Sequence, residues 1–482
     1  MRLAIDIGGT FTDLVLEHGN ELLTKKVLTS ISEPELAVIE GVSELLEENN
    51  IKASDIKMII HGTTLATNAV IERKGAKTCF ITTSGFRDVL DIGYESRFDQ
   101  YDILIDKTMS LVPRKHRYVI DERTDVNGSI ITSIDKGQFY NLITKIKNEK
   151  FESIAVGFLH SYANPENEKI LKTFLTNELP DVEVSVSSDV CPEIREYERF
   201  TTTVVNAYIK PLMSNYLKKL DQKLLNSGFN CPLLLMTSGG TLTNISSACN
   251  NPVRLVESGP AGGAILATSI AEDMNLSKVI SFDMGGTTAK ITIIENKKAI
   301  KAREFEVDRK ARFKKGSGYP LRIPVIEMVE IGAGGGSIAR VNKLEQIITG
   351  PDSAGSFPGP ACYSNGGSMP TITDADLVIG KINPDNFAGG KIKLSKQLAD
   401  KAITENIVKF VNIDNNIAAL AISEIVDETM SNAARVHTVE QGHETSNRTL
   451  IAFGGAAPLH IARVAEKLRV SNVIIPTNAS VG

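Results

Sequence analysis

Apolar and polar positions follow two different periods in the first 180 residues. Residues 3–7 and 14–17 are short apolar runs on either side of a Gly-Gly-Thr turn, which predicts a β-hairpin. Apolar side chains then recur at near-helical spacing, which predicts a helix over residues 34–49. Another apolar run at 58–60 predicts a strand that ends at His61. Strands that alternate with helices indicate an α/β fold.

A longer helix opens the second part of the chain. A helical pattern covers residues 196–226, and glycine-rich turns punctuate the sequence after it. Pro180 and Pro192 bracket a polar loop, which is typical of a domain boundary. We therefore expect two domains, residues 1–185 and residues 186–482.

Composition changes this picture little. The chain has 482 residues, 42% hydrophobic and 23% charged, which is ordinary for a globular protein of two or three domains. A formal net charge of −5 gives no electrostatic case for nucleic acid as a partner. No apolar stretch approaches the roughly 18 residues that a membrane span needs, and we predict a cytoplasmic protein without membrane contact. The five cysteines are scattered and form no CxxC pair, so we expect reduced, structural thiols.

One short motif occurs twice, each time between two apolar runs. The first copy starts at Asp6 and reads Asp-Ile-Gly-Gly-Thr-Phe-Thr, and the second starts at Asp283 and reads Asp-Met-Gly-Gly-Thr-Thr. Paired glycines let backbone N–H groups approach phosphate oxygens, because no Cβ stands in the way. An aspartate at the end of a strand can hold a hydrated Mg²⁺. A single copy is explained as well by a tight turn, but two copies with matching flanks favour phosphate binding.

The duplicated hairpin resembles the two phosphate motifs of the superfamily that contains actin, the sugar kinases and the heat-shock chaperone ATPases. That resemblance implies two ribonuclease-H-like domains around an ATP cleft. Residues 257–264, Glu-Ser-Gly-Pro-Ala-Gly-Gly-Ala, look like the first connecting helix of this fold. Residues 453–456, Phe-Gly-Gly-Ala, look like the adenosine motif, with a helix expected at about 458–468.

Further motifs narrow the resemblance to the hydantoinase A/oxoprolinase family, along the whole chain. They are His-Gly-Thr-Thr-Leu-Ala-Thr-Asn at 61–68, Glu-Arg-Lys-Gly-Ala at 72–76, Thr-Ser-Gly-Phe-Arg-Asp at 83–88, Arg-Glu-Tyr-Glu-Arg at 195–199, Ile-Gly-Ala-Gly-Gly-Gly-Ser at 331–337 and Gly-Pro-Ala-Cys-Tyr at 359–363. Membership implies an N-terminal and a central family domain here, with the C-terminal domain of full-length relatives expected to be absent. It also implies ATP-dependent opening of a cyclic amide such as hydantoin, N-methylhydantoin or 5-oxoproline, with a hydantoinase B-type partner subunit that completes the hydrolysis.

These arguments define a set of candidate site residues. We expect Asp6 and Asp283 to be catalytic and to hold Mg²⁺. His61, Thr63 and Thr64 are candidate substrate contacts, and for His61 we favour hydrogen bonding over metal ligation. The residues expected to bind ATP are Gly8, Gly9, Thr10, Thr12, Gly285, Gly286, Thr287, Thr288, Gly454, Gly455 and Ala456.

Some positions and functions stay open at this stage. Lys290 stands where many relatives carry an acidic residue, and it either approaches a phosphate or faces solvent. The glycine run at 332–337 is a phosphate-side or substrate-side loop or a plain turn, and Asp374 and Asp376 mark a metal or substrate site or, more simply, the start of a helix. Besides a cyclic amidohydrolase, the chain fits a subunit of an ATP-dependent ketone carboxylase of the acetone or acetophenone type. A non-catalytic, ATP-gated assembly protein is the alternative from another class.

Overall fold

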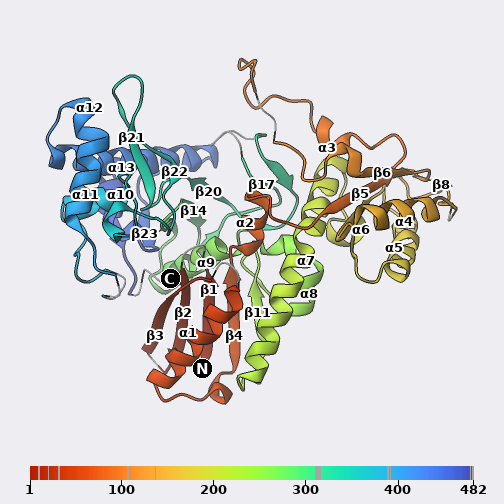
Figure 1. Cartoon of the computed structure of the whole chain (residues 1–482), viewed down its shortest axis with the longest axis horizontal. Helices are drawn as coiled ribbons and strands as arrows, with labels where there is room; N and C mark the ends of the chain where they lie inside the picture. Colours follow the sequence, from red (N-terminus) through yellow and green to blue (C-terminus); the bar gives the residue numbers. More distant parts are fainter. Residues whose placement is uncertain are drawn as a thin grey trace.

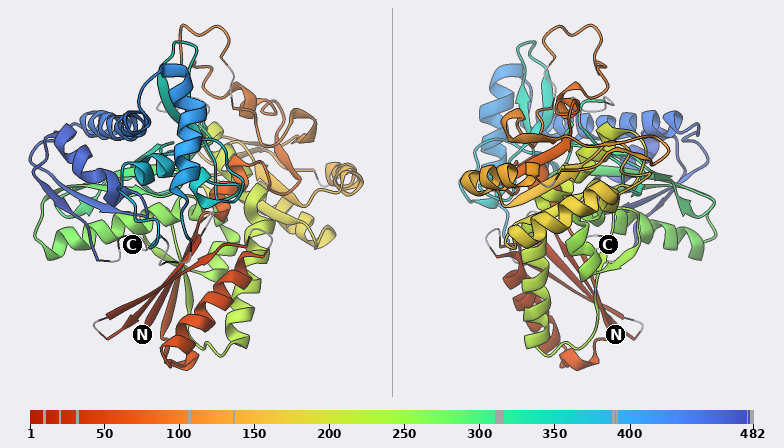
Figure 2. Two further views of the ribbon diagram at one scale, coloured as in Figure 1. Left: turned by 60° about the vertical axis from the view of Figure 1, so that its left-hand side comes forward. Right: turned by 90° about the vertical axis from the view of Figure 1, so that its right-hand side faces the viewer.

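The computed structural model shows a mixed α/β fold with several sheets (Figure 1). The structure describes residues 1–8, 11–19, 21–30, 33–105, 108–135, 137–309, 316–387, 390, 392–477 and 479. Three larger sheets make up most of the described strands, and Figure 2 shows the same arrangement from two further sides.

The first sheet has six strands in the order β12-β11-β4-β1-β2-β3. The strands are β1 (Arg2–Ile7), β2 (Phe11–His18), β3 (Glu21–Leu28), β4 (Met58–Thr63), β11 (Leu233–Met236) and β12 (Leu242–Asn244). Every second side chain of β1 is buried, as the period of a strand requires, and these side chains share a core with helices α1 (Pro34–Glu48) and α7 (Glu196–Asn226). The predicted hairpin and both predicted helices are confirmed.

The second sheet has the order β15-β14-β13-β23-β24, with β20 also paired to β14. Its strands are β13 (Lys278–Met284), β14 (Ala289–Glu295), β15 (Lys298–Ala299), β20 (Met328–Ile331), β23 (Thr449–Phe453) and β24 (Asn472–Ile474). One face packs on α10 (Ile372–Val378), α13 (Asn415–Glu440) and α14 (Ala457–Leu468), which confirms the helix predicted after the 453–456 motif. The other face packs on α9 (Ser258–Asp273).

The two sheets repeat one arrangement. In the first, β1, β2 and β3 are antiparallel, and β4 and β11 follow on the other side of β1, parallel to it. In the second, β13, β14 and β15 are antiparallel, and β23 and β24 follow on the other side of β13, parallel to it. Strands β11 and β12 complete the first sheet although they come after residue 186. This sheet therefore contains strands from both sides of the predicted domain boundary at 185/186.

The third sheet, in the order β10-β9-β5-β6, is parallel. Its strands are β5 (Thr78–Thr83), β6 (Arg117–Ile120), β9 (Ser153–Gly157) and β10 (Glu183–Val186). Helices α4 (Gly137–Glu149) and α5 (Glu166–Glu178) cover one face, and the first half of α7 covers the other. Helix α7 therefore joins the first sheet to the third (Figure 1).

Shorter elements connect these bodies. They are α2 (Leu65–Ile71), α3 (Val89–Ile92), β7 (Arg123–Thr124), β8 (Ile130–Thr132), α6 (Ser187–Val190), α8 (Ile245–Asn250), β16 (Lys301–Ala302), β17 (Phe305–Val307), β18 (Tyr319–Leu321), β19 (Val325–Ile326), β21 (Ser337–Val341), β22 (Ile347–Ser353), α11 (Lys396–Ile403) and α12 (Lys409–Val411). Strand β18 pairs with β17 and packs on α7, so this hairpin contacts the helix that joins the first sheet to the third. Among the described helices, none has the length and apolar character needed to cross a bilayer.

Candidate functional site

The two predicted aspartates occupy equivalent places in the repeated sheets. Asp6 is the second-last residue of β1, where it is in register with Asp13 on β2 and Gly62 on β4. Asp283 is in register with Lys290 on β14 and with Phe453 on β23. Each carboxylate therefore lies beside a hairpin turn and at the end of the neighbouring parallel strand.

The two carboxylates also lie close enough to influence each other. Burial, followed by the negative charges of Asp13 and Asp283, outweighs the opposing charges of Lys290 and Lys26, and together they raise the pKa of Asp6 to about 6. Burial likewise raises the pKa of Asp283, and Lys290 opposes this shift. Asp6 still keeps solvent-exposed surface. The structure thus brings the two motifs together at an acidic site that solvent reaches.

The start of α9 links the second hairpin to the end of β4 and to α2. Glu257, which precedes α9 in a left-handed conformation with φ of 61°, makes an ion pair with Lys290 at 3.1 Å. Its backbone N–H donates to Thr67 Oγ1 at 3.0 Å, and Ser258 Oγ donates to the carbonyl of Thr63 at 3.1 Å. Burial would lower the pKa of Lys290, but Glu257, Glu330 and Asp283 outweigh this and raise it, so the ammonium stays charged beside the acidic site.

The glycine run at 332–337 packs directly on the second hairpin. The N–H groups of Gly335 and Gly336 donate to the carbonyls of Gly285 and Gly286 at 3.1 and 2.7 Å. A Cβ on Gly334 would lie 2.5 Å from the backbone of Thr287, so only glycine allows this approach. The run is therefore a fixed support for the hairpin and not a free turn.

The predicted adenosine loop contacts the same hairpin. Ala456 donates its N–H to the carbonyl of Met284 at 2.9 Å. Gly454 has φ of 86°, and a Cβ there would lie 2.6 Å from Asp283 Oδ1. Both its conformation and its closeness to Asp283 therefore demand glycine at this position.

Three other glycines face open space. A Cβ added to Gly285, Gly286 or Gly455 would meet no atom within 4 Å, and none of the three has a positive φ. The backbone needs no glycine at these positions on conformational grounds. Open glycines beside an acidic pair form a cradle that a Cβ would fill, which is the arrangement that close approach of a phosphate requires.

This cradle leads to a test on Gly286. We expect Gly286→Ala to fold normally, because its methyl group meets no protein atom, yet to bind ATP at least about tenfold more weakly, since the methyl enters the space of the phosphates. Gly262→Ala in α9 is the matched control, because a Cβ there also meets nothing within 4 Å. Calorimetric titration with Mg-ATP and thermal unfolding measure the two effects, and an unchanged affinity of Gly286→Ala would contradict a phosphate site here.

Several predicted residues have local partners instead. His61 is fully buried, with Nδ1 3.1 Å from the carbonyl of Ile5 and Nε2 2.8 Å from the hydroxyl of Tyr216, and burial lowers its pKa to about 4. Its ring therefore has no nitrogen to offer a substrate, and the structure does not support the role predicted for it. Thr63 Oγ1 accepts from Leu65 N at 3.1 Å at the start of α2, whereas Thr64 Oγ1 donates to the carbonyl of Ile7 at 3.2 Å and so bonds to the first hairpin.

The first hairpin is described only in part. Thr12 is buried, with Oγ1 3.0 Å from Thr29 Oγ1, and Thr29 donates to the carbonyl of Gly8 at 3.0 Å. Gly9 and Thr10 lie outside the described residues. In the second hairpin, the carbonyl of Thr288 accepts from Gly285 N at 3.1 Å and closes the turn, while Thr287 is exposed.

Sequence reasoning missed a buried cluster of charges behind the second hairpin. His460 on α14 contacts Asp427 Oδ1 at 2.8 Å and Asp376 Oδ2 at 3.0 Å. Lys381 lies 3.6 Å from Asp376 and 4.0 Å from Asp427, and Ser423 Oγ donates to Asp376 Oδ1 at 3.1 Å. The only sequence signal was the pair Asp374 and Asp376. Asp374 forms the capping box of α10, which confirms the helix start, but nothing in the sequence connects Asp376 with a histidine on a distant helix.

The acidic pair fits the magnesium ion that the sequence implies. Within the described parts of the chain, no three His, Cys, Asp or Glu side chains form a metal-binding group. Mg²⁺ needs no such group, because it usually binds through one or two carboxylates together with waters and substrate phosphates. Burial, and after it the negative charges of Asp13 and Asp283, raises the pKa of Asp6, and a cation held by Asp6 and Asp283 would stabilise the charged form of this carboxylate.

Comparison with known protein families gives a clear assignment. The family model described as Hydantoinase/oxoprolinase N-terminal region matches residues 2–179, and the one described as Hydantoinase/oxoprolinase matches residues 199–482. The chain belongs to the hydantoinase/oxoprolinase family. The family that the motifs suggested is thereby confirmed.

Curated relatives include both characterised and uncharacterised members of this family. An uncharacterised protein of Methanocaldococcus jannaschii is 41% identical over 100% of this chain and 71% of its own length. The caprolactamase subunit alpha of Pseudomonas jessenii is 33% identical over 99% of this chain and 68% of its own length. The 5-oxoprolinase 1 of Arabidopsis thaliana is 30% identical over 98% of this chain, which spans only 40% of that longer protein.

Two solved structures share the fold along the whole chain. The ATP-dependent caprolactamase from Pseudomonas jessenii superposes with a TM-score of 0.84 at 33% identity, over 100% of this chain and 69% of that one. A nucleotide-free acetone carboxylase, described as catalysing ATP-dependent acetone carboxylation, superposes with a TM-score of 0.86 at 25% identity, also over 100% and 69%. Relatives of this chain thus include ATP-dependent enzymes that act on cyclic amides and on a ketone.

Proposed function

We propose that this chain binds Mg-ATP between its two repeated sheets and uses it to activate a cyclic amide for hydrolysis. In this proposal the two sheets belong to two ribonuclease-H-like domains around the nucleotide. The repeated strand order, with three antiparallel strands followed by two parallel ones, supports that interpretation. The observation that carries the proposal is the meeting of Asp6, Asp283 and the open glycines at one site, formed by two copies of the same hairpin.

Each element has a defined task in this proposal. Gly285 and Gly286 admit the phosphates, with the glycine run at 332–337 holding their loop in place. In the first copy of the motif we assign the same task to Gly8, Gly9, Thr10 and Thr12, with Thr12 acting through its bond to Thr29. Gly454, Gly455 and Ala456 face the adenosine, and Thr287 and Thr288 complete the second hairpin.

Asp6 and Asp283 hold the magnesium ion and its waters. A bound Mg²⁺ supplies positive charge to phosphate oxygens and so stabilises the charge that develops during phosphoryl transfer. Lys290, fixed by Glu257 at 3.1 Å, adds a positive charge to the same side of the site. It thereby replaces the acidic residue of many relatives with a group that attracts phosphate.

The chemistry explains why ATP is needed. An amide carbonyl is a weak electrophile, and its oxygen is a poor leaving group. When the γ-phosphorus of ATP bonds to the amide oxygen, the bond to the β-phosphate oxygen breaks and ADP leaves. Water then attacks the activated carbon, and the ring C–N bond opens after proton transfer to nitrogen, which leaves an acyl phosphate. A second water attacks the acyl carbon, and phosphate leaves with the former amide oxygen. The relatives named as caprolactamase subunit and 5-oxoprolinase support a cyclic amide as substrate.

A partner subunit completes the reaction in this proposal. The relative from Pseudomonas jessenii is named as an alpha subunit, which supports a multi-subunit enzyme with a hydantoinase B-type partner. We propose the N-terminal family domain over residues 1–185 and the central family domain over residues 186–482.

An oxygen-tracing experiment tests the reaction directly. Purified chain and partner subunit are incubated with Mg-ATP and a panel of carbonyl-¹⁸O hydantoin, 5-oxoproline and ε-caprolactam. We expect one of these amides to stimulate phosphate release and to place ¹⁸O in the phosphate. Stimulated turnover with unlabelled phosphate would rule out phosphorylation of the amide oxygen.

The similarity to acetone carboxylase supports a second candidate function, activation of a ketone for carboxylation. Phosphate release with acetone or acetophenone that depends on added bicarbonate would favour this candidate. Phosphate release with a cyclic amide in bicarbonate-free buffer would exclude ketone carboxylation and favour cyclic amide hydrolysis.

A further inference from the structure

An arm of exposed apolar side chains follows α3. We define the arm as residues 98–105, and the loop to which it belongs projects from the body of the molecule in Figure 1 and in Figure 2. Tyr101 is 91% exposed, and Ile103 and Leu104 are each 84% exposed. These three side chains present apolar surface on the order of 300–400 Å², a size at which surface patches are often functional.

Contacts on both sides of the arm fix its base. Before the arm, Tyr94 packs edge-to-face on Tyr197 of α7, with ring centres 5.0 Å apart. After the arm, Thr108 Oγ1 donates to the carbonyl of Ser317 at 2.5 Å. An anchored base reduces the conformational entropy that a loop loses when it binds another molecule. The arm is therefore held in position for a binding partner.

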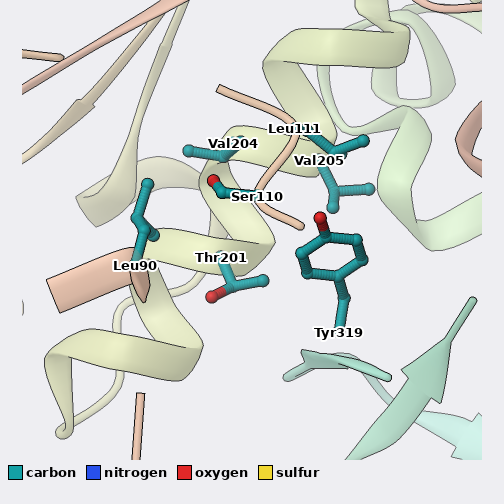
Figure 3. Close-up of a pocket in the computed structure, with 7 residues that line it drawn as sticks. All are labelled: Leu90, Ser110, Leu111, Thr201, Val204, Val205 and Tyr319. Atoms are coloured by element: carbon teal, nitrogen blue, oxygen red, sulfur yellow. The ribbon is translucent and has the colours of Figure 1, made fainter. Parts of the chain in front are cut away.

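A cavity of about 280 Å³ opens at the base of the arm. It is lined by residues 90–98, Ile105, residues 108–110, Tyr197 and residues 316–319. A much smaller hollow shares Leu90, Ser110 and Tyr319 with it (Figure 3). Polar and apolar groups alternate along the cavity, as they do in protein interfaces, where only slightly more than half of the area is nonpolar. The cavity thus extends the arm into a surface suited to the side chains of another protein.

The charges of the arm argue against a second copy of this chain as its occupant. Residues 95–105 carry the carboxylates of Glu95, Asp99 and Asp102 and one guanidinium, that of Arg97. A symmetric contact between two arms would bring the acidic groups together, and it would bury only about half of the roughly 800 Å² that each partner contributes to a standard interface. The acidic excess also opposes an anionic lipid surface. A different protein, with an apolar groove and basic residues at its rim, complements the arm.

One short helix separates the base of the arm from the first hairpin. Helix α2 starts after Thr64, whose Oγ1 donates to the carbonyl of Ile7 at 3.2 Å. Arg73, two residues after the end of α2, donates to the carbonyl of Met109 at 2.8 Å. Seven helical residues span about 10 Å. A protein bound to the arm would therefore lie close to the site that we propose for ATP.

We propose that the arm and the cavity at its base are the docking surface for the partner subunit of this chain, and that the partner presents an apolar groove rimmed by basic side chains. The identity of the partner rests on the proposed function, in which a hydantoinase B-type subunit completes the reaction. The docking surface lies apart from the two hairpins, so the partner and Mg-ATP bind to separate parts of the chain.

Substitutions at the tip of the arm test this proposal. The double variant Ile103→Ser with Leu104→Ser removes two apolar side chains that the fold does not bury. In calorimetric titration with the purified hydantoinase B-type subunit, we expect the double variant to raise Kd by roughly 10- to 100-fold. Ile131→Ser on β8 is the matched control, because that side chain is 68% exposed and lies far from the arm in Figure 1, and it should bind the partner as the wild type does.

A second variant tests the charge of the arm. Asp102 Oδ1 accepts from the N–H of Leu104 at 2.9 Å, and the amide oxygen in Asp102→Asn can accept the same bond, so the variant removes only the charge. We expect the partner to bind Asp102→Asn about three- to tenfold more weakly at low ionic strength. At about 1 M salt, where the screening length is about 3 Å, the difference should vanish. Equal affinities at low ionic strength would overturn the basic rim.

The outcomes separate the docking surface from the proposed function. Equal binding of the partner to the wild type and to the double variant would overturn the docking surface and leave the proposed function standing. If the partner did not bind the wild type, the docking surface and the two-subunit form of the proposed function would both be refuted, whereas titration with Mg-ATP would still report on the nucleotide site. Self-association of the chain that the double variant abolishes, measured by analytical ultracentrifugation, would assign the arm to a second copy instead.

The supporting result has two parts. The double variant should bind Mg-ATP as tightly as the wild type, and its amide-stimulated phosphate release should recover at saturating partner subunit. Weakened partner binding without amide-stimulated phosphate release in the wild type would uphold the docking surface and refute the proposed function.

Discussion

Asp6→Asn is expected to lower ATP-dependent phosphate release by about 100- to 1,000-fold, the usual effect of removing one group aimed at developing charge. The amide keeps the shape of the side chain but removes the negative charge that, with Asp283, would hold the magnesium ion. Asp283→Asn should have an effect of the same size, because the two residues occupy equivalent places in the repeated sheets. Steady-state kinetics with Mg-ATP and the activating amide measure both.

A control and a pH profile make this prediction specific. Asp55→Asn, at an exposed position of the same half of the chain, should leave the rate unchanged. Without a bound cation the pKa of Asp6 is about 6. At subsaturating Mg²⁺ the rate should therefore fall as the pH decreases through this value, because the protonated carboxyl group attracts the cation less. This part of the decline should vanish in Asp6→Asn. If Asp6→Asn kept its activity within threefold of the wild type, a catalytic role for Asp6 would be ruled out.

His460→Ala is expected to cost about 3–5 kcal/mol of unfolding free energy, the usual effect of breaking a buried ion pair. The substitution leaves Asp376 and Asp427 buried with Lys381 as their remaining cation, and it opens a cavity between α10, α13 and α14. His443→Ala is the matched control, because that side chain is 32% exposed and should cost less than about 0.5 kcal/mol. Urea titration of both variants measures the difference, and equal midpoints would contradict a structural role for the cluster.

The same cluster predicts a loss of stability at alkaline pH. Burial lowers the pKa of His460, but hydrogen bonds and charge from Asp376 and Asp427 outweigh this and raise it to about 9, above the usual 6.5. A raised pKa stabilises the folded state fully below pH 6.5, and this contribution is lost as the pH rises through 9. We expect wild type to lose about 3 kcal/mol more than His460→Gln between pH 6.5 and 10, since one pKa unit corresponds to about 1.4 kcal/mol. Parallel losses in both proteins would show that His460 is neutral in the fold.

Local sequence patterns predicted the elements that carry the candidate site. The hairpins at Asp6 and Asp283 formed as expected, because apolar runs flank a glycine turn in each. The helices predicted at 34–49 and 196–226 agree with α1 and α7 within one residue, because apolar side chains recur at helical spacing in each segment. The helix start predicted near Asp374 is also confirmed, because the Asp374 side chain forms the capping box of α10.

Side-chain roles that depend on distant contacts were less accessible. His61 looked like a substrate contact because it precedes a Gly-Thr-Thr turn, yet the alternation of β4 points it into the core against Tyr216. Asp376 and His460 are 84 positions apart on two different helices, and no local pattern joins them. From the sequence, the glycine run at 332–337 was equally compatible with a flexible turn. Its hydrogen bonds to Gly285 and Gly286 show that the run is held in place.

The sequence by itself determined the α/β class, the duplicated hairpin and the family, because these depend on periodicity and on short motifs within one stretch of chain. Tertiary structure decided which motifs meet. It joined β11 and β12 to the first sheet, brought Asp6 within the electrostatic influence of Asp283, and closed a cavity between the segment after α3 and β18. The physical reason is that burial, pKa shifts and cavities arise from packing between segments far apart in the chain, and such packing leaves no periodic trace in the residues that take part.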